Sequence, residues 1–396
     1  MANVTVRTVT VGIPEPHPIR AETLQQAAAI LAAARTALED SGYEVQTTRV
    51  AMRPVFEDMA SATFSQLERY GASLQRMCDE ADIAFCSLGP VPASDPAFPL
   101  TRLDILPSLL TPNPALSAAA QIATVEHGVR ADASTPVARM MHTLGLHGTG
   151  EANFRFAALA LCEPGGPFFP QAYHRGADWT ASVGLQSAGL IGRVIAEAAT
   201  TSNSAGSVIS AIPPAVERAL TREAKLIAPV VEAALQESSV TFNGFDLSPA
   251  PMGMESIAEA FESAGMGMFG EPGTLAIATA ITAGIRSVPT LTCGYNGLML
   301  PVLEDATIGE RAAEGKLTVT SLLAYSAVCG TGLDTVPIPA ETPPERVAAL
   351  LLDMASLAYR LRKPLSARLF LVPGARPGDM TQFATPYLTN TRVMAL

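Results

Sequence analysis

The chain has 396 residues, of which 48% are hydrophobic and 16% charged, and its formal net charge is −11. A chain of this length can bury a large core without disulfides or metals, and its low charge density favours an α/β fold with strands covered on both faces. The negative charge argues against a nucleic-acid partner, because phosphate binding needs a basic face.

The cysteines indicate a reducing environment. They are odd in number, widely spaced and without a CxxC pair, so neither a disulfide framework nor a structural zinc site is expected: Cys78, Cys86, Cys162, Cys293 and Cys329. The N-terminus alternates polar and apolar residues instead of forming a signal segment, and no apolar run reaches the length of a membrane span. We therefore expect a cytoplasmic protein with no membrane partner.

Strands and helices alternate through the first half of the chain. Hydrophobic periodicity predicts strands over 4–11, 43–52, 83–88, 154–162 and 180–185, and helices over 24–38, 64–81, 115–127, 136–146 and 191–199. The proline-rich stretch 89–114 is predicted to be a loop with broken helical turns.

The second half of the chain continues the alternation. Hydrophobic periodicity predicts helices over 213–236, 255–263 and 274–286 and strands over 239–247, 290–293 and 367–372. A further helix is predicted with Thr342 as its N-cap and an apolar face that reaches Leu361. Such alternation implies mostly parallel strands with helical crossovers. Without a linker or repeat, residues 1–396 are interpreted as a single α/β domain, either a closed barrel or one layered sheet.

Two turns open predicted helices and could bind an anion at a helix N-terminus. The first runs from Gly184 through Ser187 to Leu190, and the second contains Gly273 and Thr274. In each case the alternative is an ordinary tight turn or a capped helix start.

Five further residues lie where loops follow strands, which is where catalytic groups gather in α/β proteins. His174 follows a Pro/Gly-rich loop and could act as an acid or base. Asp246 and Ser248 end a strand, and Cys293 lies in a glycine-flanked turn with Asn296. The structural alternatives are a packed histidine, an Asx turn and a buried cysteine.

A series of short stretches gives the chain a family resemblance: Asp246-Leu247-Ser248 with Ala250-Pro251, Gly270, Gly273-Thr274, Cys293, Gly297-Leu298, Pro301-Val302, Glu304-Asp305, Cys329, Gly332-Leu333-Asp334, Ile338-Pro339, Thr342-Pro343 and Gly378-Asp379-Met380, with Ala172-Tyr173-His174, Val183-Gly184 and Gly189 upstream. On these stretches the chain resembles domain-of-unknown-function family 711, an uncharacterised bacterial family. The resemblance covers most of the chain, is dense after about Phe154 and is thin between Gly89 and Pro114.

The resemblance implies a fold more than a reaction. The family is grouped with pyruvate formate-lyase-like glycyl radical enzymes, whose ten-stranded α/β barrel has its helices outside, a cysteine on an inner loop and a C-terminal Arg-Val-x-Gly glycine. Here the tail reads Arg392-Val393-Met394-Ala395, without that glycine, and Glu271-Pro272 replaces an expected Thr-His. We therefore expect no glycyl radical.

The resulting expectation is a non-radical enzyme that acts on a small carboxylate- or amide-bearing metabolite, hydrolase- or lyase-like. His174, Cys293, Asp246 and Asp334 would carry the chemistry, and together with Ser248 they are expected around one cavity at the barrel mouth. A non-catalytic ligand-binding or regulatory protein is the alternative. No cofactor is predicted, although a loosely held Mg²⁺ or Ca²⁺ stays open, as does a homodimer.

Overall fold

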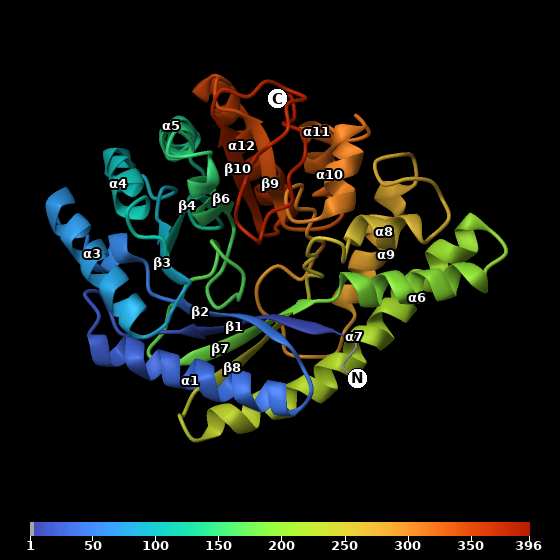
Figure 1. Cartoon of the computed structure of the whole chain (residues 1–396), viewed down its shortest axis with the longest axis horizontal. Coiled ribbons are helices and arrows are strands. Elements are labelled where there is room, and N and C mark those ends of the chain that lie inside the picture. Colours follow the sequence, from blue (N-terminus) through green and yellow to red (C-terminus); the bar gives the residue numbers. More distant parts are fainter. Residues whose placement is uncertain (1–3) are drawn as a thin grey trace.

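The computed structural model describes residues 4–396, which form one α/β domain with helices around a mixed sheet (Figure 1). The strands are β1 Thr5–Gly12, β2 Val45–Ala51, β3 Cys86–Val91, β4 Leu116–Thr124, β5 Gly128–Val129, β6 Phe156–Ala160, β7 Thr180–Gln186, β8 Thr241–Asp246, β9 Gly332–Pro339 and β10 Leu365–Val372. The helices are α1 Ala21–Asp40, α2 Val55–Asp58, α3 Phe64–Glu80, α4 Leu106–Leu110, α5 Ser134–Gly145, α6 Ala188–Thr200, α7 Ala205–Gln236, α8 Ile257–Glu262, α9 Thr274–Arg286, α10 Ala306–Ala313, α11 Val319–Tyr325 and α12 Pro344–Leu361.

The sheet has ten strands in the order β8-β7-β1-β2-β3-β4-β6-β10-β9, with the short β5 paired to β4. Strands β1, β2, β3, β4 and β6 run parallel, as predicted. The pairs β7–β8 and β9–β10 are parallel within themselves but join this central group through antiparallel contacts, β1 with β7 and β6 with β10. The sheet is therefore mixed, which the alternation of elements did not predict.

The two edge strands, β8 and β9, are not hydrogen-bonded to each other as a ladder. Single bridges connect each of them to the intervening segment: Phe245 pairs with Thr292, and Pro301 pairs with Asp334. The sheet is thus an open path, and the closed barrel of the expectation is not established. Residues 290–293, predicted as a strand, contribute only the isolated bridge at Thr292.

The sheet curves around a centre that is crossed by loops, while helices such as α1, α3, α7 and α12 lie on its outer side (Figure 1). Helix α1 buries Leu24, Ile30, Leu31 and Leu38, which recur at helical spacing. Hydrophobic side chains of strands and helices join in one large core cluster between the sheet and this outer layer. In the part of the chain that the structure describes, no helix combines the length and the hydropathy required to cross a membrane.

Three predictions need correction. Residues 115–127 were predicted to be helical, but Leu116–Thr124 form β4, which is rich in alanine and buried along nearly its whole length. Small side chains suit a strand that is covered on both faces, so packing overrides helix propensity here. Strand β9 was not predicted, and α12 begins after Pro343 instead of being capped by Thr342.

Candidate functional site: an arginine-lined cavity

A cavity of about 70 Å³ lies on the inner side of the curved sheet. Its wall is built by residues of β1, β2, β4, β6, β9 and β10 together with loops that cross the centre. Two strands contribute wall residues that are two positions apart: Thr47 with Arg49 in β2, and Ser366 with Arg368 in β10. Alternate residues of a strand point to the same face, so each of these strands contributes a polar pair to the interior.

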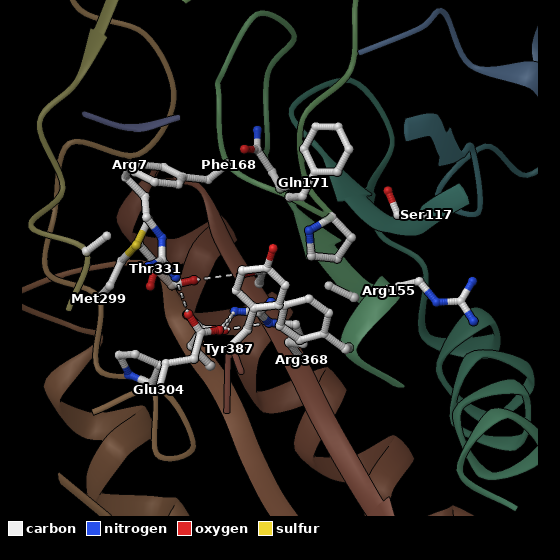
Figure 2. Close-up of a pocket in the computed structure, with 18 of the residues that line it drawn as sticks. Arg7, Ser117, Arg155, Phe168, Gln171, Met299, Glu304, Thr331, Arg368 and Tyr387 are labelled. Atoms are coloured by element: carbon white, nitrogen blue, oxygen red, sulfur yellow. Dashed lines mark hydrogen bonds and ion pairs between the residues drawn. The ribbon is translucent and has the colours of Figure 1, made fainter. Parts of the chain in front are cut away.

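The polar side of the wall is an ion-pair network (Figure 2). Glu304 bridges two arginines, with 3.0 Å from its Oε2 to Arg7 Nη2 and 2.5 Å from its Oε1 to Arg368 Nη2. Arg368 also binds Asp334, with 2.7 Å from Nη2 to Oδ1. All four side chains are nearly buried, so two guanidinium groups and two carboxylates compensate one another away from water.

Arg49 differs from these arginines, because it has no carboxylate partner among residues 4–396. Its Nε donates to Thr47 Oγ1 at 3.1 Å, and its Cζ lies 5.3 Å from the ring centroids of both Phe85 and Phe169. Burial and the charge of Arg7 lower the pKa of Arg49 to about 9, which leaves it charged at neutral pH. Arg49 is therefore a buried cation on the cavity wall that no carboxylate of residues 4–396 pairs with.

Arg155, the fourth arginine of the wall, is used differently. Its guanidinium points away from the Glu304 network in Figure 2, and its Nη1 donates to the carbonyl oxygens of Leu110, Asn113 and Leu116. It ties the segment before β4 to the start of β6, so its role is structural.

The rest of the wall is largely apolar and aromatic. Phe168 packs against Gly184 so closely that an added Cβ would lie 2.6 Å from its ring. Phe154 stacks on Tyr387 with ring centroids 6.1 Å apart and also lies under Arg368. Gly184, predicted as a ligand contact, instead makes room for an aromatic side chain of the wall.

Of the predicted site residues, Asp334 lines this cavity. Burial raises the pKa of its carboxyl, and the neighbouring Arg368 opposes that shift. A buried carboxyl group with a raised pKa can exchange a proton nearer to neutral pH than an exposed one, as acid–base chemistry requires.

Asp246, Ser248 and Asn296 form a separate cluster. Asp246 accepts hydrogen bonds from the backbone N–H groups of Ser248, Tyr295 and Asn296 and from the Ser248 hydroxyl, at 2.6–3.1 Å. Asn296 closes the cluster by accepting from the Leu247 N–H. These contacts join the end of β8 to the turn that follows Cys293. Both carboxylate oxygens of Asp246 thus accept hydrogen bonds from groups of the chain itself.

Cys293 lies beside this cluster. The pKa of its thiol is raised by burial and by the charge of Asp246, so the nucleophilic thiolate is disfavoured. Burial likewise raises the pKa of the Cys329 thiol to about 12. Neither cysteine is among the residues that line the cavity.

His174 packs elsewhere, against β1. Its Nδ1 lies 3.3 Å from Thr180 Oγ1, and an added Cβ on Gly12 would collide with its ring. Burial lowers the pKa of His174, which holds the imidazole neutral. The five residues expected around one cavity are thus divided among the cavity, the Asp246 cluster and this packed position.

The predicted anion site at the start of α6 receives a carboxylate from the chain itself. Glu255 Oε1 accepts from the Gly189 N–H at 2.9 Å, and its Oε2 accepts from the Gln186 side chain. Ser187 is the N-cap, but its hydroxyl makes no cap hydrogen bond. The sequence predicted an anion at this turn, and in the structure the carboxylate of Glu255 occupies that position.

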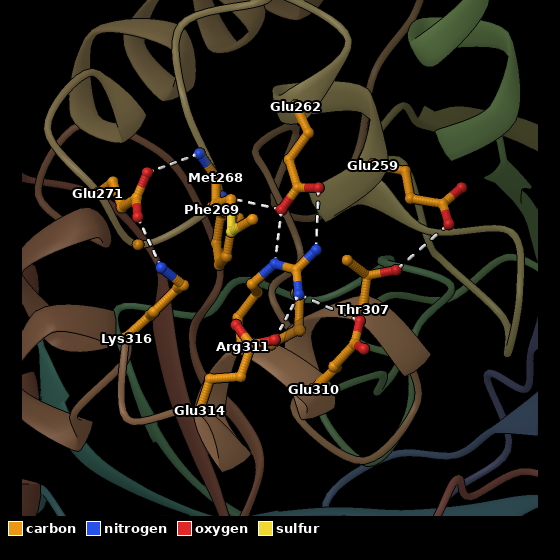
Figure 3. Close-up of polar contacts among 12 residues, drawn as sticks. Glu259, Glu262, Met268, Phe269, Glu271, Thr307, Glu310, Arg311, Glu314 and Lys316 are labelled. Carbon is orange, nitrogen blue, oxygen red and sulfur yellow. Dashed lines mark hydrogen bonds and ion pairs between the residues drawn. The ribbon is translucent and has the colours of Figure 1, made fainter.

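The turn that contains Gly273 and Thr274 is also satisfied internally. Thr274 Oγ1 accepts from the Gly270 N–H and donates to the Glu271 carbonyl, while Glu271 pairs with Lys316 at 2.6 Å. Figure 3 shows this contact beside the Arg311–Glu262 ion pair, which fastens α10 to α8. Gly273 and Thr274 therefore belong to a turn that is not part of the cavity wall.

Residue-based reasoning missed Arg7, Arg49, Glu304 and Arg368. The sequence does contain a pattern that could have indicated the three arginines: each lies in the middle of a strand whose other residues are mostly buried, as in Val6-Arg7-Thr8 and Ala367-Arg368-Leu369. A charge that a strand carries into the interior needs a partner or a ligand. Among residues 4–396, no group of three or more His, Cys, Asp and Glu side chains is placed to hold a metal ion.

The fold and the cavity together define an α/β protein with one mixed sheet and an arginine-lined interior. The family model described as Uncharacterised ACR (DUF711) matches residues 1–385, and the chain belongs to this family.

Curated relatives are named UPF0210 proteins. The chain is 35% identical to one from Pyrobaculum arsenaticum, over 64% of this chain and 56% of that protein, and 33% identical to one from Pyrobaculum islandicum, over 70% and 62%. It is 27% identical to the Methanopyrus kandleri protein MK1214, over 96% of this chain and 88% of that one. The alignments thus cover less than two thirds of each Pyrobaculum protein.

Proposed function

We propose that this protein binds a small anionic metabolite in the central cavity and acts on it by acid–base chemistry, without a radical and without a cysteine nucleophile. The observation that carries the proposal is Arg49, a buried guanidinium on the cavity wall with no carboxylate partner in the described chain. An uncompensated buried charge is costly, and a bound anion would offset that cost.

Asp334 would be the proton donor or acceptor. It is the only residue of the predicted catalytic set on the cavity wall, and Arg368 fixes the position of its carboxyl group. Arg7 and Glu304 would hold Arg368 in place and so position Asp334 indirectly.

Binding without turnover is the second candidate. It is favoured by one observation: the residues that line the cavity include neither a histidine nor a cysteine, and both carboxylates are paired with arginine. Conversion of a bound ligand by the wild-type protein, lost in Asp334→Asn while binding is retained, would decide for the enzyme.

The binding claim is tested by equilibrium dialysis of the protein against a deproteinised cell extract, followed by mass spectrometry of the retained compounds. We expect small anions to be enriched by the wild type and not by Arg49→Met. Arg362→Met is the matched control, because Arg362 also contacts an aromatic ring, Tyr359, but is exposed and outside the cavity. Equal enrichment by the wild type and Arg49→Met would contradict the proposal.

A further inference from the structure

We infer that the ligand is a short monocarboxylate, with its carboxylate on Arg49 and its apolar body against the aromatic wall, and not a phosphate, a sulfate or a larger dianion. The inference rests on the proposed function and assigns a chemical class to the ligand. It follows from the charge balance of the cavity, the free donors of Arg49, and the size and character of the wall.

The charge balance admits one negative charge. Arg7 and Arg368 are neutralised by Glu304 and Asp334, and Arg155 is bound to backbone carbonyl oxygens. Arg155 also has no carboxylate partner in the described structure, but its donors go to those carbonyl oxygens and its guanidinium points away from the ion-pair network. Arg49 is therefore the wall arginine that is left for a ligand, and a monoanion would pair with it. A dianion would place a second negative charge near Glu304 and Asp334, where like charges repel.

The donors of Arg49 suit a carboxylate. Its Nε is taken by Thr47 Oγ1, which leaves the two terminal nitrogens for a ligand. Two parallel N–H groups match the two oxygens of one carboxylate in a bidentate pair. Because Phe85 and Phe169 contact the guanidinium, its position is set before a ligand binds.

The remaining wall suits an apolar body. It is formed by side chains such as Phe168, Met299, Ala157 and Ala250, all of which are buried. Oxygen atoms of a phosphate facing these side chains would lack hydrogen-bond donors, which makes their burial unfavourable. A cavity of about 70 Å³ holds roughly five to seven water-sized groups, which corresponds to a carboxylate of about four carbons.

The test is isothermal titration at pH 8 and constant ionic strength with acetate, butyrate, octanoate, inorganic phosphate, sulfate and butyramide. We expect butyrate to bind best, and octanoate, phosphate, sulfate and the uncharged butyramide to bind at least roughly tenfold more weakly, equivalent to about 1.4 kcal/mol. Arg49→Met should lose butyrate binding by a similar factor, whereas Arg362→Met should not.

Each outcome separates the inference from the proposed function. Phosphate or sulfate binding that exceeds butyrate binding and depends on Arg49 would overturn the monocarboxylate and leave anion binding intact. Absence of Arg49-dependent binding for every anion would overturn both. If Arg49→Met fails to fold, Arg49→Lys retains the charge without the bidentate geometry and should bind butyrate more weakly than the wild type. The ranking of butyrate above octanoate and butyramide is measured on the wild-type protein, so it does not depend on whether a variant folds.

Discussion

The Asp246 cluster and the Arg49 cavity both bury a charged group, but they differ in how the chain compensates it. Asp246 accepts four hydrogen bonds from groups of its own chain, whereas Arg49 donates one to Thr47 and has no anionic partner in the described residues. The comparison suggests that a buried charge satisfied by its own chain belongs to the structure. One that is left unbalanced on a cavity wall indicates a ligand.

The sharpest test of this comparison is Asp246→Ala. The substitution would leave three buried N–H groups and one hydroxyl without their acceptor, so we expect the free energy of unfolding to fall by roughly 3 kcal/mol or more. Urea denaturation measures the change, and Asp178→Ala on the surface is the control. Asp246→Asn should lose less, because the amide retains one acceptor oxygen. Near-native stability of Asp246→Ala together with loss of ligand binding would reverse our assignment of the two regions.

A smaller effect is expected from His174, as a loss of stability in acid. Burial lowers the pKa of His174 below 6.5 in the folded protein, so the unfolded chain binds more protons as the pH falls through that value. The free energy of unfolding then decreases with falling pH, by up to about 1.4 kcal/mol per pH unit for one such group.

Urea denaturation at pH 7, 6 and 5 checks this expectation. The decrease should be shallower for His174→Gln than for the wild type. An unchanged slope in His174→Gln would show that the pKa of His174 is not lowered in the folded protein, contrary to what its burial implies, and would reopen a functional role for it.

Much of the fold could be predicted from local patterns. Helix α9 lies at the predicted residues Thr274–Arg286, and β2 and β8 lie within their predicted ranges. The errors arose where tertiary contacts decide. The alanine-rich β4 is a strand because its neighbours cover both faces, and β9 contains Pro337 and Pro339, which local rules exclude from a strand interior.

Little of the candidate site could be predicted in the same way. Asp334 was predicted from the Gly332-Leu333-Asp334 stretch that carries the family resemblance. Arg7, Arg49 and Arg368 are separated by dozens to hundreds of residues and meet only because β1, β2 and β10 share one sheet. Turn chemistry identified Gly184, Ser187, Gly273 and Thr274 as anion-binding candidates. It could not show that Glu255 lies at the first turn or that the second is closed by its own hydrogen bonds.

The smallest predicted effect concerns Glu255, whose carboxylate lies at the N-terminus of α6. Glu255→Gln retains the shape and one acceptor oxygen but removes the negative charge that the helix dipole favours there, so stability should fall by about 0.3–1 kcal/mol. Glu197→Gln, in the last turn of the same helix, is the matched control. It removes a negative charge from the unfavourable end and should be neutral or slightly stabilising in the same urea titration.

Glu255 is also connected to the cavity. It accepts from Gln186, which accepts from Gln46, which in turn accepts from Arg7. Reversing the amides of Gln186 and Gln46 in response to Glu255→Gln would turn the Gln46 NH2 group toward Arg7, which can only donate, so this chain loses one hydrogen bond. If the two regions differ as argued, the ion pair with Glu304 still holds Arg7, and ligand binding should change by less than roughly threefold, or about 0.7 kcal/mol. A loss of binding as large as that of Arg49→Met would mean that this chain of hydrogen bonds positions Arg7 for the ligand. The internal anion at α6 would then belong to the functional site and not only to the structure.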